Sequence, residues 1–383
     1  MKVIFRGKVR INGSGPFFLA DPFYPSCKTN MKHEQIISHS FMKMGNYLTA
    51  KPASAPLLQP ALSGDIAKLK QLLGSHIAST SLKSKEELAA CVNEADQEGN
   101  TALHGAIYSG NVDIVKFLIE SCHASISQKN KIGCSPLWIA CGYGHAHIVE
   151  YLFDRMNSQS YDIIQACNDS NATGDTPLLA AVFKGHAQVV EKVLATLDKN
   201  AWSALTSKNV SGDTPLHVTV SSGHEGPLLK VLLDCEDNFA NENDMNDRPL
   251  GSKNSAGLTP LLVACERNFD NIARELIKRG ADVNASDKND RTPLAIASFC
   301  GCMDVMEYLL TVETVKDLLD AKDKNGCTPL WLASRTGNLK MVKILVDAGA
   351  NYSLESNDGL SPKDAAEKFK KSNVVDFFNA KES

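Results

Sequence analysis

The sequence lacks the features that mark several common classes of protein. It contains no run of about 18 apolar residues, the length that a membrane-spanning helix needs, so we expect no transmembrane segment. Its formal net charge is only −4 over 383 residues. That charge is unlike the basic surface with which proteins neutralise phosphates. We therefore expect a soluble protein whose main partner is not a nucleic acid.

Paired cysteines are also missing. The 11 cysteines are scattered singly except for Cys300 and Cys302, and no C-x-x-C pair occurs. Structural zinc sites usually require such pairs, and disulfides belong to oxidising compartments. We interpret the cysteines as reduced thiols that pack as small apolar side chains. We expect no metal and no cofactor.

No group of residues resembles a catalytic centre. His145, His186 and His224 each follow a recurring glycine, which favours a structural role in a repeated unit. The segment Gly142-x-Gly144 closes a predicted helix, whereas a phosphate-binding glycine loop follows a strand. No Ser, His and Asp set or Cys and His set stands out. We therefore expect that the protein is not an enzyme.

The sequence does contain a repeated unit. In its fullest form, from Asp323 to Ala333, an Asn-Gly turn leads into Thr-Pro-Leu and then an alanine. The threonine position, called the anchor below, recurs at separations of 33 to 46 residues. Such a period over most of a chain indicates stacked repeats. The anchors are Ala55, Thr101, Ser135, Thr176, Thr214, Thr259, Thr292, Thr328 and Ser361.

Each recurring residue type has a physical reason. The anchor hydroxyl accepts a hydrogen bond at a helix start, and the following proline fits the first helical position. Nine residues after eight of the nine anchors lies a glycine, or Asn268 in one unit, and these residues favour the left-handed conformation that ends a helix. Apolar residues at i, i+1 and i+4 then predict a second helix. An Asp or Asn five residues before the anchor, such as Asp323, is expected to bridge the turn.

This combination resembles the ankyrin-repeat family, over about residues 55–379. The resemblance implies an all-α solenoid of stacked helix-turn-helix units with β-turn fingers. The histidine usual after Thr-Pro-Leu in the family occurs only as His104 and His217, and Trp138 and Trp331 replace it in two units. We expect a flexible tail at 1–50, an amino-terminal capping repeat with an insertion at 51–92, about seven repeats at 93–356, and a carboxy-terminal capping repeat and tail at 357–383.

Five units carry extra residues after the second helix. Four of these insertions have apolar spacing that predicts a short helical segment, around Leu88, Ile163, Leu205 and Leu318. The fifth, Asp234–Asp247, contains six acids and no base, which predicts a solvated loop. In the same unit, Pro227 enters the second helix, and we expect an irregularity there because proline removes a helical hydrogen bond.

The resemblance implies that a partner lies across a concave groove lined by turn tips and by the exposed ends of the first helices. Aromatic and arginine side chains dominate many protein interfaces. Counting from the anchors selects an aromatic amino-terminal half and a more charged carboxy-terminal half. The predicted partner-binding residues are Tyr108, Tyr143, Phe183, Glu266, Arg267, Arg291, Phe299 and Arg335. The turn-tip candidates include Gln97, Glu98, Lys131, Ile132, Asp175, Asp213, Leu258 and Lys324. The alternative is that these are ordinary, partly exposed side chains.

Two modification motifs are present. Met44 to Thr49 fits M-G-x-x-x-[ST], so Gly45 would be N-myristoylated if translation began at Met44, although we favour a chance match. The spacing of Leu276, Asp282 and Asn284 matches ankyrin loops that an asparaginyl oxygenase hydroxylates. The alternative, which we favour, is that Asn284 only closes its turn.

We predict a non-catalytic, monomeric, cytoplasmic adaptor or scaffold that binds a partner protein of unknown identity. One alternative is an N-myristoylated scaffold in peripheral contact with a membrane. Another is a targeting subunit for a separate enzyme, such as a ubiquitin ligase or a kinase, and a nuclear location is the alternative to the cytoplasm. The predicted array ends at Phe378, close to Ser383, and on this basis we expect the chain to be complete.

Overall fold

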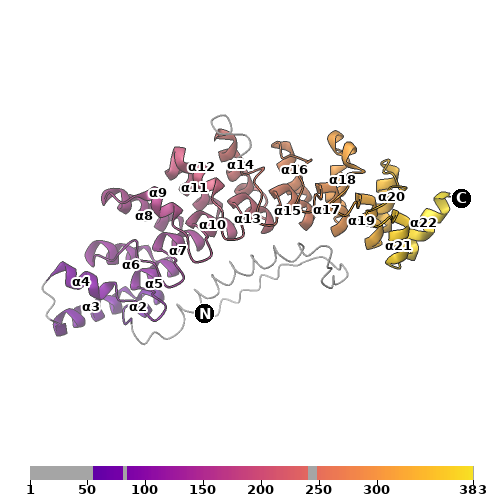
Figure 1. Cartoon of the computed structure of the whole chain (residues 1–383). Helices are drawn as coiled ribbons and strands as arrows, with labels where there is room; N and C mark the ends of the chain where they lie inside the picture. The colour runs from indigo at the N-terminus through magenta and orange to yellow at the C-terminus, as the bar shows by residue number, and fades with distance from the viewer. Residues whose placement is uncertain (1–54, 81–83, 240–247, 383) are drawn as a thin grey trace.

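The computed structural model describes residues 55–80, 84–239 and 248–382. These residues form an elongated, curved stack of helix pairs that follow one another in chain order (Figure 1). The predicted all-α solenoid is therefore confirmed. In this part of the chain, the nine first helices are α2 (Leu58–Ser63), α5 (Ala102–Ser109), α7 (Pro136–Gly142), α10 (Pro177–Phe183), α13 (Pro215–Ser221), α15 (Pro260–Arg267), α17 (Pro293–Cys300), α19 (Pro329–Thr336) and α21 (Pro362–Lys368).

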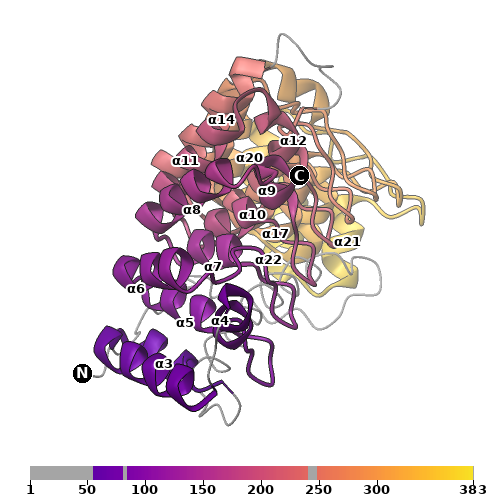
Figure 2. The same cartoon turned by 90° about the vertical axis from the view of Figure 1, so that its left-hand side faces the viewer.

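Each first helix is followed by a second helix. The second helices are α3 (Ile66–Thr80), α6 (Val112–Lys116), α8 (Ala146–Ser158), α11 (Ala187–Leu197), α14 (Pro227–Phe239), α16 (Asp270–Lys278), α18 (Met303–Leu309), α20 (Leu339–Asp347) and α22 (Ser372–Glu382). Every first helix contacts the first helix of the next unit, so these helices form one continuous layer. The turns that precede them, called fingers below, project together from one side of the stack (Figure 2).

Eight of the nine first helices in the described residues begin directly after their anchor, as the residue pattern predicts, whereas α2 begins three residues after Ala55, which has no hydroxyl. Thr176 Oγ1, for example, accepts a hydrogen bond from Leu179 N at 3.3 Å, and a proline occupies the start of the helix. Such caps typically stabilise a helix by about 1 kcal/mol. At the other end, Gly301 and Asn268 both adopt the left-handed conformation, with φ of 77° and 58°. The asparagine therefore replaces the glycine without a change of backbone path.

The fingers are bridged by the predicted Asp or Asn. Asp323 Oδ1 accepts hydrogen bonds from the backbone amides of Asn325 and Cys327, both at 2.9 Å. Where the residue is asparagine, its amide also reaches the preceding unit, as Asn254 Nδ2 does when it donates to Asp213 Oδ1 at 2.8 Å. The same side chain thus shapes its own turn and ties two units together.

A ring N–H supplies a second tie between units. In four units, the residue three positions after the anchor donates to the carbonyl that directly precedes the next anchor. The donors and acceptors are His104 Nε2 to Cys134 O (3.3 Å), Trp138 Nε1 to Asp175 O (2.9 Å), His217 Nε2 to Leu258 O (2.9 Å) and Trp331 Nε1 to Leu360 O (3.1 Å). Tryptophan therefore takes over the hydrogen bond of the family's histidine.

The four helical insertions are confirmed. Three are α-helices, α4 (Lys85–Val92), α9 (Ile163–Asn168) and α12 (Ala201–Thr206), and the fourth is a 3₁₀ helix at Glu313–Leu318. The helix α4 starts with a capping box, in which Ser84 Oγ accepts from Glu87 N and the Glu87 carboxylate accepts from Ser84 N. In each case the inserted residues extend the unit and leave the stacking of the first helices intact.

The predicted acidic loop is wrong for residues 234–239, which form the last turns of α14. The acidic residues within 234–239 form ion pairs with Arg248 and Arg279, which lie beyond the predicted loop. Glu236 is 1% exposed and accepts from Arg248 Nε at 3.0 Å, while Asp234 accepts from Arg279 Nη2 at 2.7 Å. Counting charges within the segment missed these distant partners. Residues 240–247 lie outside the described residues.

Pro227 disturbs its unit only at the helix start. It is the first residue of α14, where its missing N–H leaves no intrahelical bond unmade. The helix begins 13 residues after its anchor, Thr214, whereas α16 begins 11 residues after Thr259. Gly226, with a φ of 75°, absorbs the late start.

The cysteines among the described residues form no disulfides, and most are buried. Burial raises the pKa of Cys122 to about 11 and that of Cys167 to about 12, so both stay protonated at neutral pH. Across the described part of the chain, no helix combines the length and apolar character that crossing a membrane would require. Cys27 lies outside the described residues.

Candidate partner-binding surface

The first helices and the fingers together present one face of the stack, which we call the inner face (Figures 1 and 2). Neighbouring fingers are joined by backbone hydrogen bonds, such as Lys131 N to Glu98 O and Ala172 N to Ile132 O, both at 2.9 Å. Gly99 has a φ of 82°, and a Cβ there would lie 2.9 Å from Lys131 N. The glycine is therefore needed for both the turn and the close approach of the next finger.

Two tyrosines predicted to bind a partner lie together on this face. Tyr108 lies in the last turn of α5 and Tyr143 directly follows α7, and their ring centroids are 4.7 Å apart at an interplanar angle of 64°. Both are half-buried. Burial, and secondarily the neighbouring Tyr108, raises the pKa of Tyr143, so this phenol remains neutral. The pair offers rigid aromatic surface of the kind that proteins use in interfaces.

The third predicted aromatic, Phe183, lies at the end of α10 and is half-buried. Lys184 Nζ lies 5.4 Å from the centre of its ring, a cation–π distance. Burial lowers the pKa of this lysine. Phe183 thus has a positive charge over its ring.

A row of histidines supports this aromatic half. His145 Nε2 donates to Tyr108 O at 3.3 Å, and His224 Nε2 donates to Phe183 O at 3.0 Å. The ring of His186 fills the space next to Gly144, where a Cβ would lie 2.6 Å from Nδ1. These contacts give the histidines an inter-repeat packing role, as the sequence indicated.

The predicted exposure of three residues in the carboxy-terminal half is wrong. Arg291, Phe299 and Arg335 are 1%, 4% and 8% exposed. Arg291 pairs with Asp287, its Nε and Nη2 atoms lying 2.9 Å and 2.6 Å from Oδ2. An offset counted from the anchor identifies a position on the helix, but it does not tell whether the side chain enters the neighbouring repeat.

Arg335 is enclosed by aromatic rings. Its guanidinium carbon lies 4.7 Å from the ring centre of Phe369, 5.9 Å from that of Phe299 and 6.0 Å from that of Trp331. Glu266 and Arg267, at the end of α15, are half-buried and remain partly accessible. The charged half of the inner face is therefore smaller than predicted.

Several turn-tip candidates point into the stack. Asp175, Asp213 and Leu258 are 0%, 8% and 1% exposed. Asp175 accepts from Asn209 Nδ2 at 3.3 Å, and burial raises the pKa of its carboxyl group to about 6. The prediction that these three residues contact a partner is therefore wrong. They pack between repeats instead.

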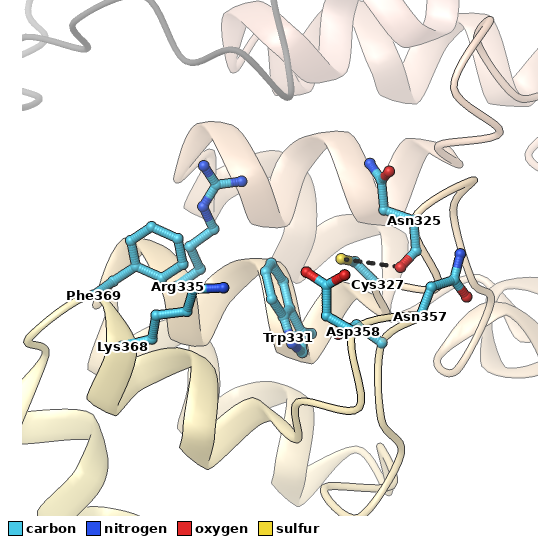
Figure 3. Close-up of a pocket in the computed structure, with 9 residues that line it drawn as sticks. Asn325, Cys327, Trp331, Arg335, Asn357, Asp358, Lys368 and Phe369 are labelled. Atoms are coloured by element: carbon cyan, nitrogen blue, oxygen red, sulfur yellow. Dashed lines mark hydrogen bonds between the residues drawn. The ribbon is translucent and has the colours of Figure 1, made fainter.

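A pocket opens on the inner face near the carboxy-terminal end (Figure 3). Its volume is about 470 Å³, part of it open to solvent. Residues from two fingers and from α19 and α21 line it: Asn325, Cys327, Trp331, Arg335, Ser356, Asn357, Asp358, Lys368 and Phe369. Of these, sequence reasoning selected only Arg335 as a binding residue. Trp331, at a position usually occupied by histidine, was the signal that could have drawn attention to this end.

The sequence contains two modification candidates, of which the structure describes one. Asn284 is exposed, and its backbone amide donates to Asp282 Oδ1 at 2.9 Å. Gly45 lies outside the described residues. Whether either residue is modified stays a prediction.

The fold and the inner face define a helical repeat protein with an extended surface. A family model for ankyrin repeats in three copies matches residues 57–163, 122–203, 226–317 and 311–381. These matches cover more than half of the chain, which therefore belongs to the ankyrin-repeat family. The recognition made from the sequence is confirmed.

Individual relatives share only part of the chain. The chain is 30% identical to tyrosine-protein kinase HTK16 of Hydra vulgaris over 130 residues, 34% of this chain and 17% of the kinase. It is 35% identical to ankyrin repeat-containing protein ITN1 of Arabidopsis thaliana over 136 residues, 33% of this chain and 22% of the relative. It is 42% identical to protein fem-1 homolog A-like of Mus musculus over 72 residues, 19% and 11% of the two chains. The matches thus span less than a quarter of each relative.

Proposed function

We propose that the protein is a non-catalytic adaptor or scaffold that binds a partner protein across its inner face. The observation that carries this proposal is the paired placement of Tyr108 and Tyr143, whose rings are 4.7 Å apart on adjacent units. A rigid scaffold that presents half-buried aromatic side chains loses little conformational entropy when it binds. Membership of a repeat family whose members present extended concave surfaces supports the same function.

The aromatic half can be tested directly. A partner is first identified by affinity capture with the full chain and mass spectrometry, and its dissociation constant is then measured by calorimetry. Replacing both Tyr108→Ala and Phe183→Ala should weaken binding at least about tenfold, because interface aromatics each typically contribute more than about 1 kcal/mol.

The matched control removes two aromatic residues from the second helices, Tyr151→Ala and Tyr308→Ala. Both are half-buried, as the inner-face residues are. This control should bind as the wild type does. Equal affinity of the inner-face variant and the wild type, with unchanged far-ultraviolet circular dichroism, would contradict the proposal.

A second function is that of a targeting subunit for a separate enzyme. It is favoured by the match to a segment that makes up 17% of a tyrosine-protein kinase. In this case the captured partner would carry enzymatic activity, and the chain would change its substrate preference without turning over substrate alone. An assay of the captured complex, with and without the inner-face variant, separates the two functions.

The remaining features belong to the proposal as well. We infer a monomer in the cytoplasm with no nucleic-acid partner. Myristoylation of Gly45 and hydroxylation of Asn284 are each tested by mass spectrometry of the protein isolated from its native cells. A free, unmodified amino-terminal segment would exclude the peripheral-membrane alternative.

A further inference from the structure

The pocket near the carboxy-terminal end combines aromatic walls with an excess of positive charge. Trp331 and Phe369 form part of its walls, and Arg335 lies against both rings. Lys368 adds a second cation, whereas Asp358 is the one carboxylate among the lining residues. In Figure 3, the side chains of Lys368 and Asp358 are directed toward the face of Trp331. The net charge of the lining favours an anionic ligand.

A buried hydroxyl group at the same pocket lacks a hydrogen-bond partner. Ser356 is 8% exposed and lines the pocket, and its Oγ has no partner among the described residues. Its neighbour Asn357, in contrast, donates from Nδ2 to Lys324 O at 2.9 Å. Buried polar groups without a partner are uncommon in folded proteins and point to a missing ligand or water. Ser356 thus retains an unused hydrogen-bonding group beside the pocket.

The size of the pocket limits what can enter it. The volume of about 470 Å³ includes space that is open to solvent, so the pocket can take a side chain and not a folded domain. The two fingers that border it carry amide side chains, Asn325 and Asn357, and the second already donates from Nδ2 to Lys324 O. Side-chain amides can donate to and accept from the backbone of an extended peptide. The site is therefore suited to a linear segment.

We propose that this pocket binds the carboxylate of an Asp or Glu in an extended partner peptide, with a neighbouring apolar side chain against Trp331 and Phe369. Lys368 and Arg335 neutralise the carboxylate, and the Ser356 hydroxyl donates to it. Asp358 repels a second negative charge, so the pocket prefers a monoanion to a phosphate group. This inference rests on the proposed function, because it names the chemistry of one contact on the inner face.

The test uses the intact chain and a phage-displayed library of random twelve-residue peptides. Enriched peptides are synthesised with a fluorescent label, and their affinity is measured by anisotropy. We expect them to share one acidic residue next to an apolar residue. Replacing that acid by its amide, or introducing Lys368→Gln, should weaken binding about tenfold, and salt should weaken it further.

The aromatic wall has a matched pair of variants within the chain. Trp331→His removes indole surface from the pocket but retains a ring N–H for Leu360 O, as His217 does for Leu258 O. Trp138→His makes the same change at a fully buried position that does not line this pocket. We expect about a tenfold loss of affinity for Trp331→His and none for Trp138→His.

The outcomes separate this inference from the proposed function. Selected peptides without a shared acid, peptides that prefer phosphoserine, or equal binding by Trp331→His and the wild type would overturn the assignment of this pocket. Failure to select any peptide would also overturn it, because the pocket is assigned to a linear segment. The proposed function would survive each of these results if a captured partner still responds to Tyr108→Ala with Phe183→Ala.

Discussion

Acidification should destabilise the stack through two buried histidines, His104 and His217. In each, Nε2 donates to a carbonyl of the next unit, so the neutral ring carries its proton there. The Nδ1 atom lies 2.8 Å from the hydroxyl of the anchor, Thr101 or Thr214, and accepts from it. A second proton at Nδ1 would remove this acceptor and place a charge in a site without solvent. Burial lowers the pKa of both rings to about 4.

The size of the effect follows from these pKa values. A histidine whose pKa is lowered on folding contributes stability that is complete above its unfolded pKa of about 6.5 and is lost as the pH falls toward 4. The full contribution is about 3 kcal/mol per histidine, of which about 2 kcal/mol is lost at pH 5. Asp175, whose pKa is raised to about 6, acts in the opposite sense. Its contribution is lost as the pH rises through 6, so acidification from pH 7 to 5 restores about 1 kcal/mol.

From these three groups together we therefore expect the free energy of unfolding to fall by about 3 kcal/mol between pH 7 and pH 5. Urea titrations followed by circular dichroism at both pH values measure it. The double variant His104→Gln and His217→Gln keeps an amide donor in each site but has no titrating group, so most of this fall should disappear. The exposed His147→Gln serves as the control and should behave as the wild type does. The same pH dependence in the double variant and the wild type would refute the role of these rings.

Two further predictions concern the stack itself. Gly144→Ala combines a strained φ of 76° with a clash against the His186 ring, so it should destabilise the protein by about 2 kcal/mol or more. Gly226→Ala has a similar φ of 75° but open space around its Cβ, and in urea unfolding it should cost only about 1 kcal/mol. A larger loss for Gly226→Ala would contradict this ranking. Arg279→Met removes the ion pairs to α14 and should cost about 1–3 kcal/mol, whereas the exposed Lys316→Gln should change stability by less than about 0.5 kcal/mol. Indistinguishable urea midpoints for the last two variants would show that the Arg279 pairs contribute nothing.

The predictable part of the fold rests on interactions within a few residues. The anchor cap at Thr176 and the turn bridge at Asp323 join groups two to four positions apart, so their residue types reveal them. The same rule applies to Asn171, five residues before Thr176, whose Oδ1 accepts from the amides of Thr173 and Asp175.

The candidate site was only partly predictable, for a geometric reason. Position on a first helix identified Tyr108 and Tyr143, and stacking brought their rings into contact. The same count selected Phe299 and Arg335, but the neighbouring unit covers them. Burial of a side chain between repeats depends on the size and rotamer of residues about 30 to 45 positions away, which a count along one helix does not contain.

The sequence by itself determined the unit, its caps, its turns and the family, because these depend on local hydrogen bonds and on backbone conformations that few residues adopt. Only the tertiary structure decided that Asp234 pairs with Arg279, 45 residues away, where the sequence alone predicted a solvated loop. It also decided that Arg335 and Lys368 meet at one pocket with Trp331. A charged or aromatic side chain interacts with the groups that lie next to it in space. Which groups lie next to it depends on how whole units pack against one another.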